Sequence, residues 1–313
     1  MSEPYKIQWQ PTEFHLELRG VRHRLLRWHD SSSPSTAPTV VLLHGFQDCS
    51  DTFQFLIDAM PRRWQFVALD WRGFGGSDWQ DGPYWFVDYL ADLDALLQTL
   101  MPNEPVRVIG HSMGGNIAGS YAGVRPERIR WLISLEGFGL QRTSSDLAPQ
   151  RYRDWLDQVR AGPRPSKRES VSTLAAALLR RNPRLSVPIA NYVANAWMRA
   201  NPVDGRLALH FDPWHRLINP VLYRREEAEA CWRNVVAPVL IALGAESEYR
   251  RRLEADGDLE RFIQCFRHAE VADFEGVGHM LHHEAPIVMA QRFADWIERQ
   301  EQRQEQRSDV ASV

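Results

Sequence analysis

The sequence lacks the features that mark secreted, membrane-spanning and disulfide-stabilised proteins. Its 313 residues include three cysteines, which are widely spaced and form no C-x-x-C pair, so no disulfide framework is expected. No apolar run approaches the ~18 residues that a membrane span requires. The N-terminus, MSEPYKIQWQ, also lacks the apolar core of a secretion signal. We therefore expect a soluble, cytoplasmic protein without a membrane partner.

An excess of charge of one sign is also missing. The formal net charge is -3, with 37 Lys and Arg residues against 40 Asp and Glu residues. A chain without a basic field has little to hold nucleic acid, so no nucleic-acid partner is expected. No G-x-x-x-x-G-K phosphate loop occurs. The glycines of RGFGGSD at 72–78 indicate a turn, and no cofactor is expected.

Short apolar runs are the main structural signal in the chain. Nearly continuous runs suit strands that are buried on both faces of a parallel sheet, and they lie at 38–45, 64–70, 105–110, 128–135 and 237–244. Two earlier strands are predicted at 14–20 and 21–29. Apolar residues recur every three or four positions at 84–101 and 285–300, which predicts helices. Strands alternating with helices predict an α/β fold with helices on both sides of the sheet.

The alternation breaks in one long stretch, and this break suggests the domain organisation. Residues 137–223 contain no clear buried strand, but they show helical patterns at 149–160, 171–181 and 186–200. We predict a mostly helical cap there, inserted into a core formed by 1–136 and 224–300. The polar stretch 301–313 is predicted to be a flexible tail.

The segment VIGHSMGGN at 108–116 predicts a nucleophile. Ser112 is flanked at two residues' distance by Gly110 and Gly114, which matches G-x-S-x-G, and an apolar strand precedes the motif while a small-residue helix follows it. A turn this tight leaves no room for bulky side chains at the two glycine positions. It would present the serine at the carboxyl end of the sheet, where α/β folds hold their ligands.

A serine hydroxyl needs a base, and tetrahedral oxyanions need fixed donors. His279, in the Gly-flanked loop of FEGVGHMLHHEAP, is the predicted base, since His282 and His283 belong to the start of the last helix. The predicted oxyanion donors are the N–H of Met113, directly after the serine, and the N–H of Phe46, in the loop after the first central strand.

With these motifs in place, the chain resembles the α/β-hydrolase-fold serine hydrolases. The similar segments are HGF at 44–46, DWRGFGGSD at 70–78, GHSMGG at 110–115 and GVGHMLHHEAP at 276–286, in the family's order and spacing. The resemblance implies an α/β-hydrolase fold with a mostly parallel central sheet and a cap. It also implies Ser112 as nucleophile, His279 as base, and Phe46 and Met113 as oxyanion donors.

The carboxylate that completes the triad departs from the common family pattern. Many relatives carry it three residues after the glycine that closes the next-to-last strand, but here that position is Ser247, flanked by Glu246 and Glu248. The other known location is the end of the strand after the nucleophile helix, where Glu136 stands; some relatives of the haloalkane dehalogenases carry Glu there. A carboxylate ending a buried strand is costly unless it is paired, so Glu136 is predicted, with Glu246 and Glu248 as alternatives.

Two other groups of residues are given structural roles. HFDPWH at 210–215 matches no standard zinc spacing, so cap packing is predicted rather than a metal site. Cys49 lies near the oxyanion loop, but the sequence shows no paired base for it and no cause for a lowered pKa.

The predicted function is cleavage of a small-molecule carboxylic ester, or a related acyl bond, through an acyl-enzyme on Ser112. The alternatives on the same machinery are acyl transfer and the cleavage of lactones, thioesters, amides or carbon–carbon bonds. A non-catalytic ligand-binding member of the fold is the alternative of a different class. The sequence gives no oligomeric state.

Overall fold

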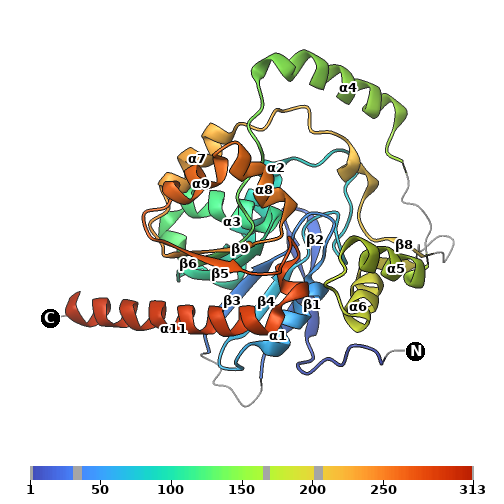
Figure 1. The fold of residues 1–313 in the computed structure, drawn as a ribbon. Coiled ribbons are helices and arrows are strands. Elements are labelled where there is room, and N and C mark those ends of the chain that lie inside the picture. Colours follow the sequence, from blue (N-terminus) through green and yellow to red (C-terminus); the bar gives the residue numbers. More distant parts are fainter. Residues whose placement is uncertain (1–2, 31–36, 165–169, 201–206, 312–313) are drawn as a thin grey trace.

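The computed structural model describes residues 3–30, 37–164, 170–200 and 207–311. At its centre lies a mostly parallel sheet (Figure 1), which has eight strands. The strand order is β1-β2-β4-β3-β5-β6-β9-β10. The first two strands are antiparallel to their neighbours and the other six run parallel. Their bounds are Thr12–Leu18 (β1), Val21–Trp28 (β2), Thr39–Leu43 (β3), Gln65–Leu69 (β4), Val106–His111 (β5), Ile129–Leu135 (β6), Val239–Gly244 (β9) and Ala269–Phe274 (β10).

Each predicted strand is present, within two residues of the predicted bounds. Strands β3, β4, β6 and β9 carry four or more buried residues in succession. This burial on both faces explains why their sequences are continuously apolar rather than alternating.

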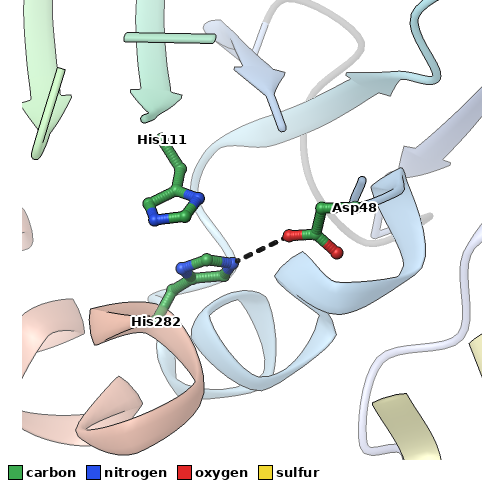
Figure 2. A group of neighbouring side chains, drawn as sticks. All are labelled: Asp48, His111 and His282. Carbon is green, nitrogen blue, oxygen red and sulfur yellow. Dashed lines mark ion pairs between the residues drawn. The ribbon is translucent and has the colours of Figure 1, made fainter. Parts of the chain in front are cut away.

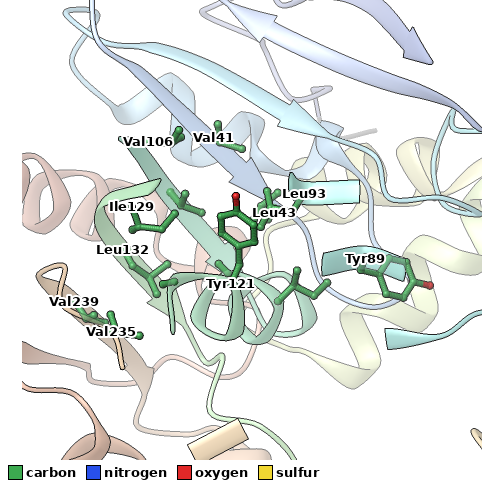
Figure 3. Packing of buried hydrophobic residues seen from close by; sticks show 14 of the residues in the cluster. Val41, Leu43, Tyr89, Leu93, Val106, Tyr121, Ile129, Leu132, Val235 and Val239 are labelled. Carbon is green, nitrogen blue, oxygen red and sulfur yellow. The ribbon is translucent and has the colours of Figure 1, made fainter. Parts of the chain in front are cut away.

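Helices cover both faces of the sheet. One face packs against α2 (Phe86–Leu100), α3 (Met113–Val124), α7 (Arg225–Arg233), α8 (Glu248–Ala255) and α9 (Asp258–Cys265). The other packs against α1 (Gln54–Ala59), α10 (Leu281–Glu284) and α11 (Pro286–Ala311). In the first of these two cores, Tyr121 of α3 lies among Val41, Leu43 and Leu132 of the strands below (Figure 3). This two-sided packing confirms the predicted fold class.

Within its described residues, 137–164, 170–200 and 207–223, the insertion contains three α-helices and a small hairpin. The helices are α4 (Ala148–Ala161), α5 (Val171–Arg181) and α6 (Val187–Trp197), and the hairpin pairs β7 (Met198–Ala200) with β8 (Leu207–Leu209). The predicted helix at 186–200 therefore ends three residues early, because Met198 turns extended and pairs with Leu209. The division into core and cap stays a prediction.

Helix α11 does not stop at residue 300, where the sequence predicts a flexible tail. It continues to Ala311. Glu301 anchors the extension, because its carboxylate accepts hydrogen bonds from Arg107, Arg130 and Trp131 on the strands below. Across the described ranges, no helix has the length and apolar character needed to cross a membrane.

Candidate active site

The turn from β5 into α3 presents Ser112. Its backbone is in the left-handed region, at φ 49°, which costs energy for a residue with a side chain. The flanking glycines make the turn possible. A Cβ on Gly114 would lie 2.2 Å from the carbonyl oxygen of Leu43, and one on Gly110 would lie 2.7 Å from the backbone of Gly114. The strand, turn and helix that the motif requires are therefore all present.

His279 lies in the loop after β10, with its ring between two partners. Its Nε2 is 3.1 Å from Ser112 Oγ, and its Nδ1 is 2.8 Å from Glu136 Oε2. An ionised carboxylate can only accept a hydrogen bond, so Nδ1 carries the proton and the lone pair of Nε2 faces the serine hydroxyl. The side chain is 21% exposed, which leaves the ring open to a substrate.

Glu136 directly follows β6, and its side chain has no exposure to solvent. Oε1 accepts a hydrogen bond from the N–H of Gly244 at 2.9 Å, and Oε2 accepts one from Ser247 Oγ at 2.5 Å. With His279, three donors hold this buried carboxylate, and these hydrogen bonds compensate for the cost of its burial. The backbone of Glu136 also has a positive φ, 51°.

Ser247 has a role that the sequence analysis missed. It stands at the common family position of the acid, where the sequence shows only that a carboxylate is absent. In the structure it caps α8, and its hydroxyl also donates to Glu136. Ser247 and Glu136 are 111 positions apart in the chain, so the sequence carries no signal of this contact.

The two alternative carboxylates lie elsewhere. Glu246 is 47% exposed and approaches Arg184 and Arg251 at 3.9 and 3.7 Å. Glu248 is 79% exposed and lies 3.8 Å from Arg252. The structure therefore brings Glu136 to His279 and places Glu246 and Glu248 in surface ion pairs.

The loop after β3 packs directly on the serine turn. A Cβ on Gly45 would lie 2.8 Å from His111 Nδ1 and 3.3 Å from the Cβ of Ser112, so only glycine fits. Among the loop and turn hydrogen bonds of the described residues, none is donated by the backbone N–H of Phe46 or Met113. Both groups therefore stay the candidate oxyanion donors.

Behind the serine, His111 supports the histidine loop. Its Nε2 lies 2.9 Å from the carbonyl oxygen of His279, which can only accept, so Nε2 carries the proton. Burial, with His282 and His279 nearby, lowers the pKa of His111 well below its ordinary value. His111 is therefore a neutral imidazole that holds the backbone of the residue beside Ser112.

Cys49 does not compete as a nucleophile. The residue is 1% exposed, and burial together with nearby carboxylates raises the pKa of its thiol well above the ordinary value. A thiol in that environment stays protonated and unreactive.

The HFDPWH segment joins the insertion to the core. Asp212 accepts a hydrogen bond from the hydroxyl of Tyr84 at 2.7 Å. His215 stacks between Phe74 and Tyr84, with ring centroids 3.9 and 3.7 Å away. These contacts agree with the packing role predicted for the segment.

A second tie reaches the histidine loop. Glu284 of α10 accepts hydrogen bonds from the N–H of Gly278 at 2.7 Å and from the side chain of Asn182, after α5, also at 2.7 Å. The carboxylate of Glu284 thus links Gly278, next to His279, to Asn182 of the insertion.

Comparison with known proteins gives one consistent family. Residues 38–286 match the family model for the alpha/beta hydrolase fold. The chain is 28% identical over 275 residues to a serine hydrolase-like protein of Danio rerio, covering 85% of this chain and 83% of that protein. It is 25% identical over 215 residues to 2-(acetamidomethylene)succinate hydrolase of Mesorhizobium japonicum, covering 68% and 72%. The solved thioesterase domain from the curacin biosynthetic pathway superposes with a TM-score of 0.74 at 25% identity, covering 90% of this chain and 98% of that one. The chain therefore belongs to the alpha/beta hydrolase fold family.

Proposed function

We propose that the chain is a serine hydrolase that cleaves a small-molecule carboxylic ester through an acyl-enzyme on Ser112. One observation carries the proposal: a continuous hydrogen-bonded line from Ser112 Oγ through His279 to Glu136, with links of 3.1 and 2.8 Å. Nucleophile, base and orienting carboxylate within hydrogen-bond reach are the geometric signature of acyl transfer.

Acylation follows from that geometry. Ser112 Oγ attacks the ester carbonyl carbon while His279 Nε2 takes the hydroxyl proton. The carbonyl oxygen becomes an oxyanion, and the N–H groups of Phe46 and Met113 stabilise it. When the tetrahedral intermediate collapses, the carbon–oxygen bond to the alcohol breaks, and His279 gives its proton to the leaving alkoxide.

Deacylation repeats the same steps with water. His279 Nε2 takes a proton from a water molecule, whose oxygen attacks the acyl carbon. The second tetrahedral intermediate expels Ser112 Oγ, which recovers the proton from His279. The products are a carboxylic acid and the free serine.

Glu136 supports both steps without giving up its charge. It accepts from Nδ1–H, which keeps Nε2 as the lone-pair nitrogen and stabilises the imidazolium that forms during each attack. The donors from Gly244 and Ser247 fix the carboxylate in that position.

Thioester cleavage or acyl transfer on the same residues is the second candidate. It is favoured by the similarity to a thioesterase domain and to a 1-acylglycerol-3-phosphate O-acyltransferase of Arabidopsis thaliana. Both reactions share the acylation of Ser112 and differ in the leaving group or in the acceptor that replaces water.

The test is a panel of p-nitrophenyl esters of increasing acyl length, with matched acyl thioesters and with glycerol as an added acceptor. We expect ester hydrolysis by the parent chain and none above background by Ser112→Ala. Faster cleavage of the thioesters, or acylated glycerol as the main product, would favour thioester cleavage or acyl transfer over ester hydrolysis. A folded parent chain inactive on the whole panel would contradict both.

A further inference from the structure

A second cluster of polar side chains lies directly behind the serine turn. Asp48 in the loop after β3, His111 at the end of β5 and His282 of α10 each offer a ligand atom, and these atoms lie within 4.8 Å of one another. The three residues are 4%, 1% and 0% exposed. Figure 2 shows their side chains converging from three separate elements.

Most of the atoms facing one another in this cluster have no hydrogen-bond partner. Within the part of the chain that the structure describes, these are Asp48 Oδ2, His111 Nδ1 and both ring nitrogens of His282. Asp48 Oδ2 lies 3.6 Å from His282 Nε2, close enough for an ion pair but too far for a hydrogen bond. Buried polar atoms without partners are costly, so such a group calls for an explanation.

The carboxylate is held by one oxygen only. Asp48 Oδ1 accepts hydrogen bonds from the N–H of Cys49 at 2.9 Å, the hydroxyl of Thr52 at 2.8 Å and the indole of Trp197 at 2.7 Å. These three donors fix the carboxylate and leave Oδ2 toward the histidines. The arrangement is typical of a metal ligand oriented by a second shell of hydrogen bonds.

The imidazole of His111 is fixed in the same way. Its Nε2–H donates to the carbonyl oxygen of His279, so Nδ1 must be the nitrogen with the free lone pair. An imidazole nitrogen with a free lone pair is the form of histidine that binds a metal ion.

We propose that Asp48, His111 and His282 form a binding site for a divalent transition-metal ion, with Zn²⁺ as the reference ion. Two imidazole nitrogens and one carboxylate oxygen are a donor set that zinc accepts, with a water molecule as fourth ligand. The ion would give a partner to Asp48 Oδ2, to His111 Nδ1 and to one ring nitrogen of His282, and it would balance the charge of Asp48.

Binding requires the cluster to contract. Zinc bonds of about 2.0–2.1 Å place tetrahedral ligands about 3.3 Å apart, whereas the present atoms are spread over up to 4.8 Å. Asp48 shares its loop with Gly45 and Phe46, and His111 adjoins Ser112 in the chain. A contraction therefore pulls on the serine turn and on the loop of the oxyanion donors, so the metal-bound form should be inhibited.

Metal binding is tested by titrating chelator-treated full-length chain with Zn²⁺ in a calorimeter, and with Co²⁺ by visible absorption. We expect one equivalent, a Kd of micromolar or tighter, and the absorption of four-coordinate Co²⁺. Asp48→Asn, which keeps the Oδ1 acceptor, and His282→Gln should each weaken binding at least 30-fold. Circular dichroism checks the fold of each variant.

Two matched variants identify where the ion binds. His268→Gln removes an exposed histidine, and His279→Gln removes the proposed catalytic base. Both should bind Zn²⁺ within threefold of the parent. No stoichiometric binding by the parent overturns the proposal, and so does binding that His279→Gln abolishes while Asp48→Asn and His282→Gln retain it.

Inhibition rests on the proposed function, whereas binding does not. Zn²⁺ at ten times its Kd should lower the parent's ester hydrolysis at least fivefold, and chelator should restore it. His282→Gln, compared with its own metal-free rate, should lose less than twofold. A parent that binds Zn²⁺ and keeps its rate contradicts the inhibition, and a parent without esterase activity leaves the binding result standing by itself.

Discussion

At the scale of single residues, Glu136 combines three features that are each unusual for a carboxylate. It is a buried carboxylate at the end of a buried strand, with a positive φ. Three donors compensate for its burial, and one of them is the base beside Ser112. The strain at Ser112 and at Glu136 is concentrated where the proposed chemistry takes place, as is common at functional sites.

Glu136→Gln tests the carboxylate directly. The amide cannot stabilise the imidazolium and no longer enforces the Nδ1–H tautomer, so we expect kcat to fall about 10³–10⁴-fold. KM should change little, since the side chain is buried behind His279. Steady-state ester hydrolysis measures both constants, and Glu246→Gln/Glu248→Gln is the control with near-parent rates. A loss of less than tenfold in a folded Glu136→Gln chain would argue against the triad.

The triad carboxylate can be moved from position 136 to position 247. Its Oγ lies 2.5 Å from Glu136 Oε2, so an aspartate at 247 can place an oxygen near the same point. We expect Glu136→Ala/Ser247→Asp to recover at least tenfold of the kcat/KM lost in Glu136→Ala. Ser247→Asp alone brings two carboxylates together and should lower both rate and stability. Equal rates for Glu136→Ala and the folded double variant would show that the position cannot serve His279.

The residues of the proposed triad could be predicted because each interrupts its surroundings. Ser112 and His279 are polar residues within glycine-rich turns, and Glu136 is a charged residue at the end of an apolar run. The Asp48, His111 and His282 cluster could not be predicted, since its members come from three distant segments and only the folded sheet brings them together.

At the scale of elements, buried strands are the part of the fold that the sequence predicts well. Continuous apolar runs have few other stable environments in an α/β protein. The helix predicted at 186–200 is too long, because the spacing of apolar residues cannot show that Met198 pairs with Leu209 of β8. The flexible tail at 301–313 is a prediction from polar composition alone; in the structure residues 301–311 continue α11, and Glu301 makes tertiary contacts that composition cannot show.

Glu301→Gln tests that anchor and its pH dependence. Burial alone would raise the pKa of Glu301, but hydrogen bonds from Arg107, Arg130 and Trp131 lower it to about 2. A lowered folded pKa gives stability that is present above the unfolded value of about 4.3 and is lost as pH falls toward 2. We expect Glu301→Gln to lower the free energy of unfolding at pH 7 by up to about 3 kcal/mol.

Urea unfolding at pH 7, 4 and 2.5 measures the effect. The difference between parent and Glu301→Gln should shrink as the pH falls. Glu305→Gln, at an exposed position on the same helix, is the control and should match the parent at each pH. A difference that stays constant with pH would show that the ion pairs are not its source.

At the scale of the whole molecule, the buried His215 joins the insertion to the core and should make the fold sensitive to acid. Burial lowers the pKa of His215 to about 3, where the ring stacks between Phe74 and Tyr84. In the unfolded chain His215 therefore binds a proton near pH 6.5, whereas in the folded chain it binds one only near pH 3. Stability falls through that interval as pH decreases.

His215→Phe should remove this difference in proton binding between the folded and the unfolded chain. Between pH 6.5 and 5 we expect the parent's loss of unfolding free energy to exceed that of His215→Phe by up to about 1.4 kcal/mol per pH unit. Thermal unfolding at several pH values measures it, with His29→Gln, at an exposed position, as control. Equal losses in parent and His215→Phe would mean that the ring is already protonated in the folded chain.

The most direct test of the central claim is labelling with a fluorophosphonate probe, followed by mass spectrometry of the labelled peptide. We expect phosphonylation of Ser112 in the parent, none in Ser112→Ala, a steep loss of labelling rate in Glu136→Gln, and an unchanged rate in Glu246→Gln/Glu248→Gln. Label on another residue, or a labelling rate that Glu136→Gln leaves unchanged, would contradict the triad of Ser112, His279 and Glu136.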